Sequence, residues 1–130
     1  MERMAPVGIV AAIALIEYVV FVFRAGRARG RHGIAAPAVT GHPDFERNLR
    51  VQENTVEQLV IFLPALFLCA FFVSPPVAAG LGLVFVVGRG LYAHAYVTNP
   101  SKRGPGFLLT LASNFLLLLG GLVGAVLELL

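Results

Sequence analysis

The chain has 130 residues, of which 58% are hydrophobic and 13% are charged, a composition too apolar for a soluble domain of this size. The formal net charge of +3 is local, since four arginines lie between residues 24 and 31, and this excludes an extended nucleic-acid surface. A single cysteine, Cys69, excludes a disulfide framework, and the spacing of the three histidines predicts no metal site. We therefore expect one integral membrane domain over residues 1–130, with no nucleic-acid partner.

Four apolar segments follow one another, at about residues 5–23, 56–73, 77–97 and 106–127. The first contains one charged residue, Glu17, and is too long for a signal peptide; Arg24 follows it without a small-residue cleavage motif. The arginine-rich, glycine-broken sequence from Arg24 onward predicts the start of a loop. Asp44 is the expected N-cap of the helix that opens at Phe45.

Short connections join the later segments. Pro64 lies within the second segment and predicts a kink, and Ser74-Pro75-Pro76 separates the second segment from the third. The third segment is rich in glycine, which permits close helix packing. Four apolar helices with short links predict an all-α, membrane-embedded four-helix bundle.

Basic residues mark two of the connections. Four arginines follow the first segment, and Lys102 and Arg103 follow the third, whereas the opposite side carries few charges. The positive-inside rule predicts that both basic connections lie in the cytoplasm and that both termini lie outside. The expected location is a bacterial inner membrane, which the chain crosses several times, with its polar site facing the cytoplasm.

The helix that opens at Phe45 carries polar side chains on one face, namely Arg47, Arg50, Asn54 and Glu57. Charged groups near lipid are costly unless they face protein, water or a ligand. A solvated helix end with ion pairs is the competing interpretation, and it suits Arg50 and Glu57 poorly. Because the polar face continues into apolar sequence, we favour a binding surface.

A second polar face closes the third segment, where Arg89, Tyr92 and Tyr96 share one side of a helix. Tyrosines also occur at membrane interfaces without a binding role, but here they share a face with an arginine. With Arg103 just beyond, these groups suit a small anionic ligand with many hydrogen-bonding atoms. Glutathione is such a molecule, and its thiol, with a pKa of about 8.5, needs a nearby cation to ionise at neutral pH.

The combined pattern Glu46-x3-Arg50-x3-Asn54-x2-Glu57, Arg89-x2-Tyr92-x3-Tyr96 and Arg103 resembles the family of membrane-associated proteins in eicosanoid and glutathione metabolism (MAPEG). The resemblance covers essentially the whole chain and implies a homotrimer with glutathione bound between neighbouring subunits. The implied glutathione-contacting residues are Arg29, Arg50, Gln52, Asn54, Glu57, Arg89, Tyr92 and Tyr96. Arg103 matches the arginine that stabilises the thiolate, and Tyr92 is the second candidate for this catalytic role.

The implied activity is that of a glutathione-dependent membrane transferase or peroxidase. Its thiolate would attack lipophilic electrophiles or hydroperoxides in detoxification. Two alternatives remain open. Glu17 in a small four-span protein also resembles small multidrug transporters, in which a membrane carboxylate exchanges protons for cationic drugs. The same family also contains non-catalytic lipid-binding scaffolds, although the presence of Arg103 favours an enzyme.

Overall fold

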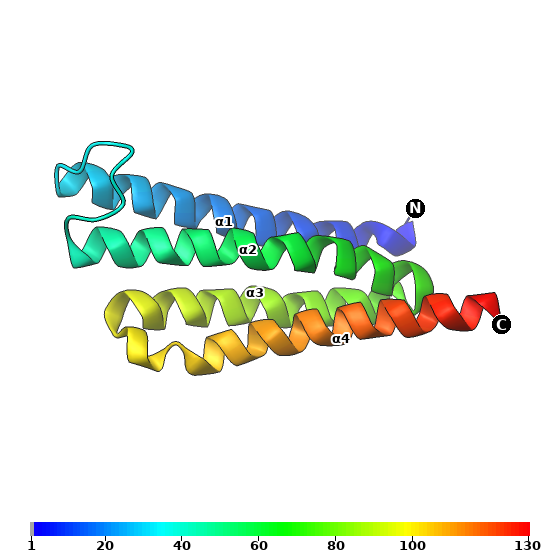
Figure 1. The fold of residues 1–130 in the computed structure, drawn as a ribbon. Coiled ribbons are helices and arrows are strands. Elements are labelled where there is room, and N and C mark those ends of the chain that lie inside the picture. Colours follow the sequence, from blue (N-terminus) through cyan, green and yellow to red (C-terminus); the bar gives the residue numbers. More distant parts are fainter. Residues whose placement is uncertain (1) are drawn as a thin grey trace.

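The computed structural model describes residues 2–130 as four long helices, α1 (Ala5–Arg31), α2 (Pro43–Phe72), α3 (Pro75–Thr98) and α4 (Gly104–Leu129), with two short 3-10 helices, η1 (Glu2–Met4) and η2 (Pro100–Lys102). The long helices lie side by side, with both chain ends at one end of the bundle and the α1–α2 loop at the other (Figure 1). All four are long and apolar enough to cross a membrane. The prediction of an all-α protein with four apolar helices is confirmed.

Helix α1 extends further than we expected from the sequence. It continues beyond Phe23 through the basic sequence to Arg31, so the prediction of a loop starting at Arg24 is wrong. Alanine and arginine are good helix formers, and Ala25 and Ala28 in this stretch are buried against the bundle. The four arginines of residues 24–31 therefore belong to a helix and not to a loop.

Helix α2 begins at Pro43 and is capped by His42, whose Nδ1 accepts a hydrogen bond from the Asp44 amide at 3.1 Å. The prediction that Asp44 is the N-cap is therefore wrong. Its carboxylate instead accepts a hydrogen bond from Arg31 Nη1 at 3.0 Å and contacts His32 Nε2 at 2.9 Å. Because Asp44 lies in the first turn of α2, these contacts join the end of α1 to the start of α2.

Helix α2 continues through Pro64 as a single helix. A proline inside a helix removes one backbone hydrogen bond and favours a bend. Figure 1 shows the last turns of α2 bending toward α4. The link to α3 is short because Ser74 caps α3 at once, its Oγ accepting a hydrogen bond from the Val77 amide at 3.4 Å.

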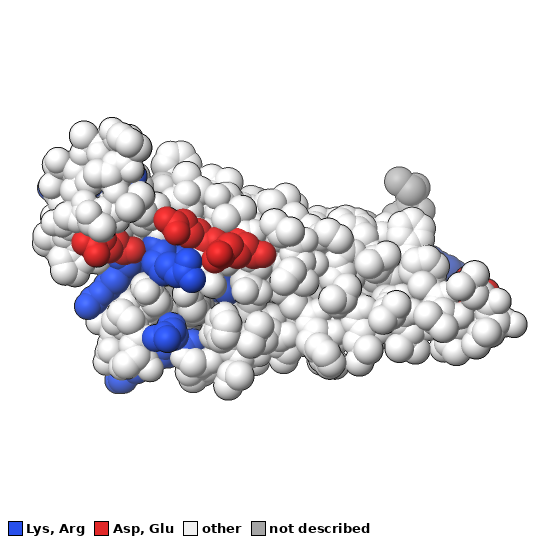
Figure 2. Space-filling view, viewed as in Figure 1, with Lys and Arg blue, Asp and Glu red and all other residues white. Residues whose placement is uncertain are grey.

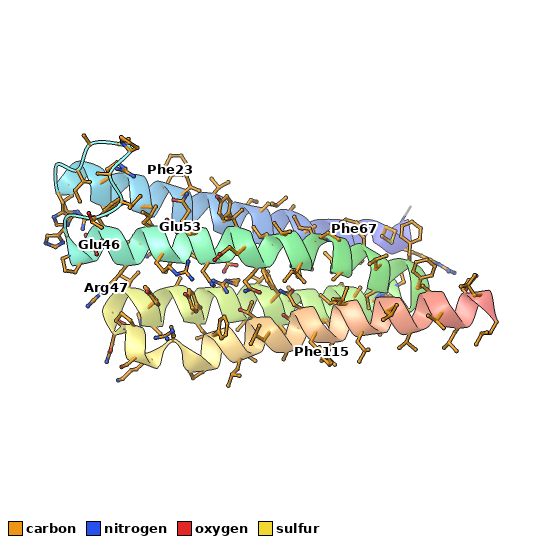
Figure 3. All side chains as sticks on the ribbon, in the orientation of Figure 1. Phe23, Glu46, Arg47, Glu53, Phe67 and Phe115 are labelled. Carbon is orange, nitrogen blue, oxygen red and sulfur yellow. The ribbon has the colours of Figure 1, made fainter. Side chains whose placement is uncertain are left out.

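Apolar side chains fall into an inner set and an outer set. In the core, Phe62 and Phe85 stack with ring centroids 3.9 Å apart, and Leu117 is also fully buried. In the outer set, Phe23 and Phe115 point away from the bundle (Figure 3). Large apolar side chains on the outside suit contact with lipid, where they are solvated by hydrocarbon. The arrangement is that of a multi-pass integral membrane protein.

Helices α2 and α4 approach each other closely at two glycines of α4. A Cβ at Gly121 would lie 2.7 Å from Leu68 Cβ, and one at Gly124 would lie 2.5 Å from the Phe72 carbonyl oxygen. A side chain at either position therefore requires the helices to move apart. In contrast, Gly80 of the glycine-rich α3 has nothing within 4 Å of an added Cβ.

We expect Gly121→Ala to destabilise the bundle by about 1–3 kcal/mol, because the added methyl group overpacks the α2–α4 contact. Thermal unfolding of the detergent-solubilised protein measures this change. Gly80→Ala is the matched control, since it enters open space and improves helix propensity, and it should not lower the melting temperature. Equal melting temperatures for Gly121→Ala and the unchanged protein would contradict the close approach.

Candidate functional site

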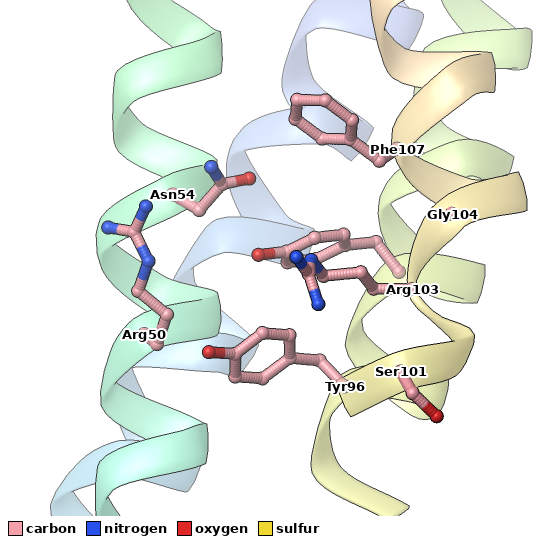
Figure 4. A pocket seen from close by; sticks show the side chains of 8 residues that line it. Arg50, Asn54, Tyr96, Ser101, Arg103, Gly104 and Phe107 are labelled. Atoms are coloured by element: carbon pink, nitrogen blue, oxygen red, sulfur yellow. The ribbon is translucent and has the colours of Figure 1, made fainter. Parts of the chain in front are cut away.

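A cleft of about 580 Å³ opens between α2, α3 and the start of α4, at the end of the bundle opposite the chain termini (Figure 4). Its lining residues are Arg50, Asn54, Tyr92, Tyr96, Ser101, Arg103, Gly104 and Phe107. The volume lies within the range of small-molecule sites, roughly 300–1,000 Å³. The cleft brings together members of both polar faces predicted from the sequence.

Two neighbouring helices supply the walls of the cleft. Helix α2 contributes Arg50 and Asn54, which lie one helical turn apart on the same face. Helix α3 contributes Tyr92 and Tyr96, whose rings stack with centroids 5.5 Å apart. The Tyr96 hydroxyl is directed toward α2, across the cleft (Figure 4).

The turn between α3 and α4 carries Arg103 to the cleft. Asn99 Oδ1 caps this turn by accepting a hydrogen bond from the Ser101 amide at 3.2 Å, and Pro100 opens the short helix η2. Arg103 follows η2 directly, and its Nη1 donates a hydrogen bond to the Pro100 carbonyl at 3.0 Å. The guanidinium points from this turn toward α2 (Figure 4). Arg103 therefore lies in the connection between η2 and α4, directly before the first turn of α4.

Behind the cleft, Arg89 is fully buried and does not line it. Its Nη2 donates hydrogen bonds to Asn54 Oδ1 at 2.7 Å and Thr55 Oγ1 at 3.1 Å, and its Nη1 donates to Thr110 Oγ1 at 3.3 Å. Its Cζ also lies 4.3 Å from the centroid of the Tyr92 ring. Arg89 thus orients two cleft residues from behind, one on α2 and one on α3.

The charges of α2 have different surroundings, although they share one face. Arg50 Nη1 lies 3.4 Å from Glu57 Oε1 and 4.0 Å from Glu53 Oε2, so the expectation that Arg50 and Glu57 would pair poorly is wrong. Arg47 Nη1 instead donates to the Val97 carbonyl at 3.2 Å, at the end of α3. Figure 2 shows these charged side chains gathered toward the end of the molecule that holds the cleft.

Besides Arg89, three predicted ligand-contacting residues lie outside the cleft lining. Arg29 donates to the Ala38 carbonyl at 2.7 Å and its Cζ lies 4.5 Å from the Phe45 ring centroid, so it anchors the α1–α2 loop. Gln52 is half-buried on another side of α2, and Glu57 is exposed beside Arg50. Neither Gln52 nor Glu57 belongs to the cleft lining.

Five residues that the sequence did not single out belong to the site or support it. Ser101, Gly104 and Phe107 line the cleft, and Thr55 and Thr110 hold Arg89. Neutral residues of this kind add nothing to a pattern of charges. Only Thr55 could have been noticed from the sequence, because it directly follows Asn54 of the polar face.

The lining suits an anionic ligand. Among the residues that the structure describes, the cleft contains two guanidinium groups, two phenols and an amide, and no carboxylate. The Arg103 guanidinium makes one hydrogen bond to a neutral carbonyl, and Arg50 is only partly neutralised at the rim. Several donors are thus available to carboxylate, peptide and thiolate groups.

Known proteins resemble this chain over most of its length. The MAPEG family model matches residues 7–123. An uncharacterized protein of Synechocystis is 47% identical over 115 residues, which cover 88% of this chain and 84% of that protein. Microsomal glutathione S-transferase 2 of Homo sapiens is 40% identical over 104 residues, covering 80% of this chain and 71% of that protein. Leukotriene C4 synthase of Cavia porcellus is 29% identical over 102 residues, which cover 78% of this chain and 68% of that protein. The resemblance seen in the two polar faces is thereby confirmed, and the chain belongs to the MAPEG family.

Proposed function

We propose that this protein is a glutathione-dependent membrane transferase that activates the glutathione thiol for attack on lipophilic electrophiles. The observation that carries the proposal is the cleft in which Arg103, from the α3–α4 turn, faces Arg50 and Asn54 on α2 beside two tyrosines of α3. Microsomal glutathione S-transferase 2, a relative by sequence, is by its name an enzyme that uses glutathione. The donor-rich cleft is consistent with the same co-substrate.

Each cleft residue has a role that follows from its chemistry. Arg50 is suited to pair with a carboxylate of glutathione, and the Asn54 amide is suited to a peptide group. Arg103 supplies the positive charge that favours the thiolate over the thiol, and the Tyr92 hydroxyl is the alternative donor to sulfur. The thiolate then forms a C–S bond to the electrophilic carbon, whose leaving group or opened ring oxygen takes the electron pair. With a lipid hydroperoxide, a second glutathione is needed to complete the reduction.

The oligomer is part of the proposal. A homotrimer with glutathione between neighbouring subunits, as the family resemblance implies, gives a use to predicted residues that face away from the cleft of their own protomer. Gln52 is half-buried and Glu57 is exposed, both outside the cleft lining, and Arg29 lies beside the α1–α2 loop. From those positions they are suited to reach a ligand held by an adjacent subunit.

The alternatives are less well supported. A transporter would use Glu17 to bind a cation, but the Glu17 carboxylate lies beside Gly90, next in sequence to the buried Arg89, and a positive charge there opposes cation binding. A non-catalytic lipid-binding scaffold would have no need for an arginine directed into a polar cleft. Detoxification of lipophilic compounds is the broader role that we propose, with a lipid hydroperoxide as the second class of substrate.

The proposed setting is a bacterial inner membrane, with the cleft on the cytoplasmic side and both termini outside. We expect Val39→Cys, in the exposed α1–α2 loop, and Leu130→Cys, at the exposed C-terminus, to label from opposite sides of the membrane. The measurement uses a membrane-impermeant maleimide on intact and permeabilised cells, in a background where the buried Cys69 is replaced by Ala. Labelling of Val39→Cys in intact cells would reverse the proposed orientation.

Arg50→Ala should raise the glutathione dissociation constant at least tenfold, because a charge-assisted hydrogen bond is worth about 1.5–3 kcal/mol. Glu57→Ala should also raise it, since Glu57 contacts Arg50 and is suited to the ligand's amine. Isothermal titration calorimetry in detergent measures the glutathione dissociation constants of both variants.

Arg47→Ala is the matched control for the loss of one positive charge from α2. Its side chain reaches the Val97 carbonyl and lies outside the cleft lining, so glutathione affinity should change little. If Arg47→Ala weakens binding as much as Arg50→Ala does, the effect is one of general charge, and the role of Arg50 in the cleft is contradicted.

Arg103→Ala should abolish the thiolate absorbance of bound glutathione at neutral pH and lower kcat, while glutathione affinity stays within a few-fold. The reason is that Arg103 interacts mainly with the ionised sulfur, so its loss affects turnover more than binding. Activity should partly recover at alkaline pH, where the thiol ionises without help. Ultraviolet difference spectra and pH–rate profiles provide the measurement.

Three variants sharpen this test. Lys102→Ala, a neighbouring exposed cation outside the cleft lining, is the control and should behave like the unchanged protein. Arg103→Lys should retain part of the thiolate band, since a point charge near sulfur matters more than a two-pronged contact. If Arg103→Ala keeps the full band and Tyr92→Phe loses it, the phenol and not the guanidinium activates the thiol.

A further inference from the structure

Arg89 is a buried cation whose contacts are all to neutral groups. Its hydrogen-bond acceptors are an amide oxygen and two hydroxyl oxygens, and its Nε has no hydrogen-bond partner among the described residues. Among residues 3–130, no carboxylate forms an ion pair with it within 4.0 Å. A buried charge is costly unless an opposite charge compensates it.

Glu17 is the carboxylate in the middle of α1, where this helix packs against α3. Its Oε1 is buried and has no hydrogen-bond partner. Its Oε2 lies 3.5 Å from the position that a Cβ would occupy at Gly90, the residue next to Arg89. The Glu17 carboxylate therefore lies against α3 beside Gly90.

Among the described residues, Glu17 and Arg89 thus each present a buried polar atom without a hydrogen-bond partner, and they lie on the adjoining helices α1 and α3. Ionisable residues inside a membrane are retained where they pair with each other or serve a site. Opposite charges on adjoining helices attract each other more in a low-dielectric interior than in water.

We propose that Glu17 is the counter-ion of Arg89 and, through it, a positioning residue for the cleft. Glu17 touches no cleft residue that binds the ligand in the proposed function. It acts by holding the Arg89 guanidinium in place, and that group in turn orients Asn54, at 2.7 Å, and Tyr92, at 4.3 Å from its ring centroid. This role in ligand binding rests on the proposed function; the pairing of the two charges does not.

The test begins with Glu17→Gln, which keeps size and hydrogen bonding but removes the charge. It should raise the glutathione dissociation constant about threefold to tenfold, as expected when one oriented hydrogen bond is lost. At saturating glutathione the thiolate band and kcat should be retained, because Arg103 is unchanged. Glu17→Asp, which keeps the charge, should recover much of the affinity. Glu128→Gln, which removes an exposed carboxylate near the end of α4, is the control and should have no effect.

A double-variant cycle tests the pairing without any ligand. Glu17→Gln and Arg89→Gln should each lower the melting temperature in detergent, and the double variant should lower it by less than the two losses added together. Strictly additive losses would overturn the pairing. An unchanged glutathione affinity in a folded Glu17→Gln variant would overturn the positioning role. If the unchanged protein does not bind glutathione, the proposed function fails, and the melting temperatures still decide whether the two charges are partners.

Discussion

The buried guanidinium of Arg89 is the contact on which the geometry of the cleft depends. Its hydrogen bonds reach Asn54 and Thr55 on α2 and Thr110 on α4, so one side chain of α3 joins three helices at the level of the cleft. Donors left without acceptors inside a membrane protein are costly, which opposes any displacement of these helices. Asn54 and Tyr92 therefore reach the cleft from a rigid wall.

The membrane explains why polar contacts and glycines matter so much in this fold. Lipid chains are as apolar as the core, so the hydrophobic effect does little to hold the helices together. Close approach at Gly121 and Gly124 of α4 and the buried polar network of Arg89 supply that cohesion in its place. On the face that Figure 2 shows, the charged side chains lie mostly toward the end of the molecule opposite the chain termini.

The electrostatics of the cleft connect this architecture to its proposed chemistry. Arg50 is tethered at the rim by Glu57, whereas Arg103 is attached only to a backbone carbonyl within its own turn. A cation that is not already neutralised stabilises a developing or resident negative charge more effectively than a paired one. This difference is why we assign the thiolate to Arg103 and the ligand's carboxylate to Arg50. Both assignments use one protomer, and an adjacent subunit would add to them from outside.

Segment length and helical periodicity were sufficient to predict four apolar helices and two polar faces, and the family was indicated by the resemblance of the residues on those faces. These properties are local, so they can be derived from consecutive residues. Periodicity also placed Arg50, Asn54 and Glu57 on one polar face and Arg89 on the other, but it could not say which of them reach the cleft. That depended on how the helices are rotated against each other: the packing of α2 on α3 and α4 turned Asn54 inward, left Glu57 outside and buried Arg89 behind the wall. The position of Arg103 likewise followed from the η2 turn, whose geometry arises from contacts that periodicity does not describe.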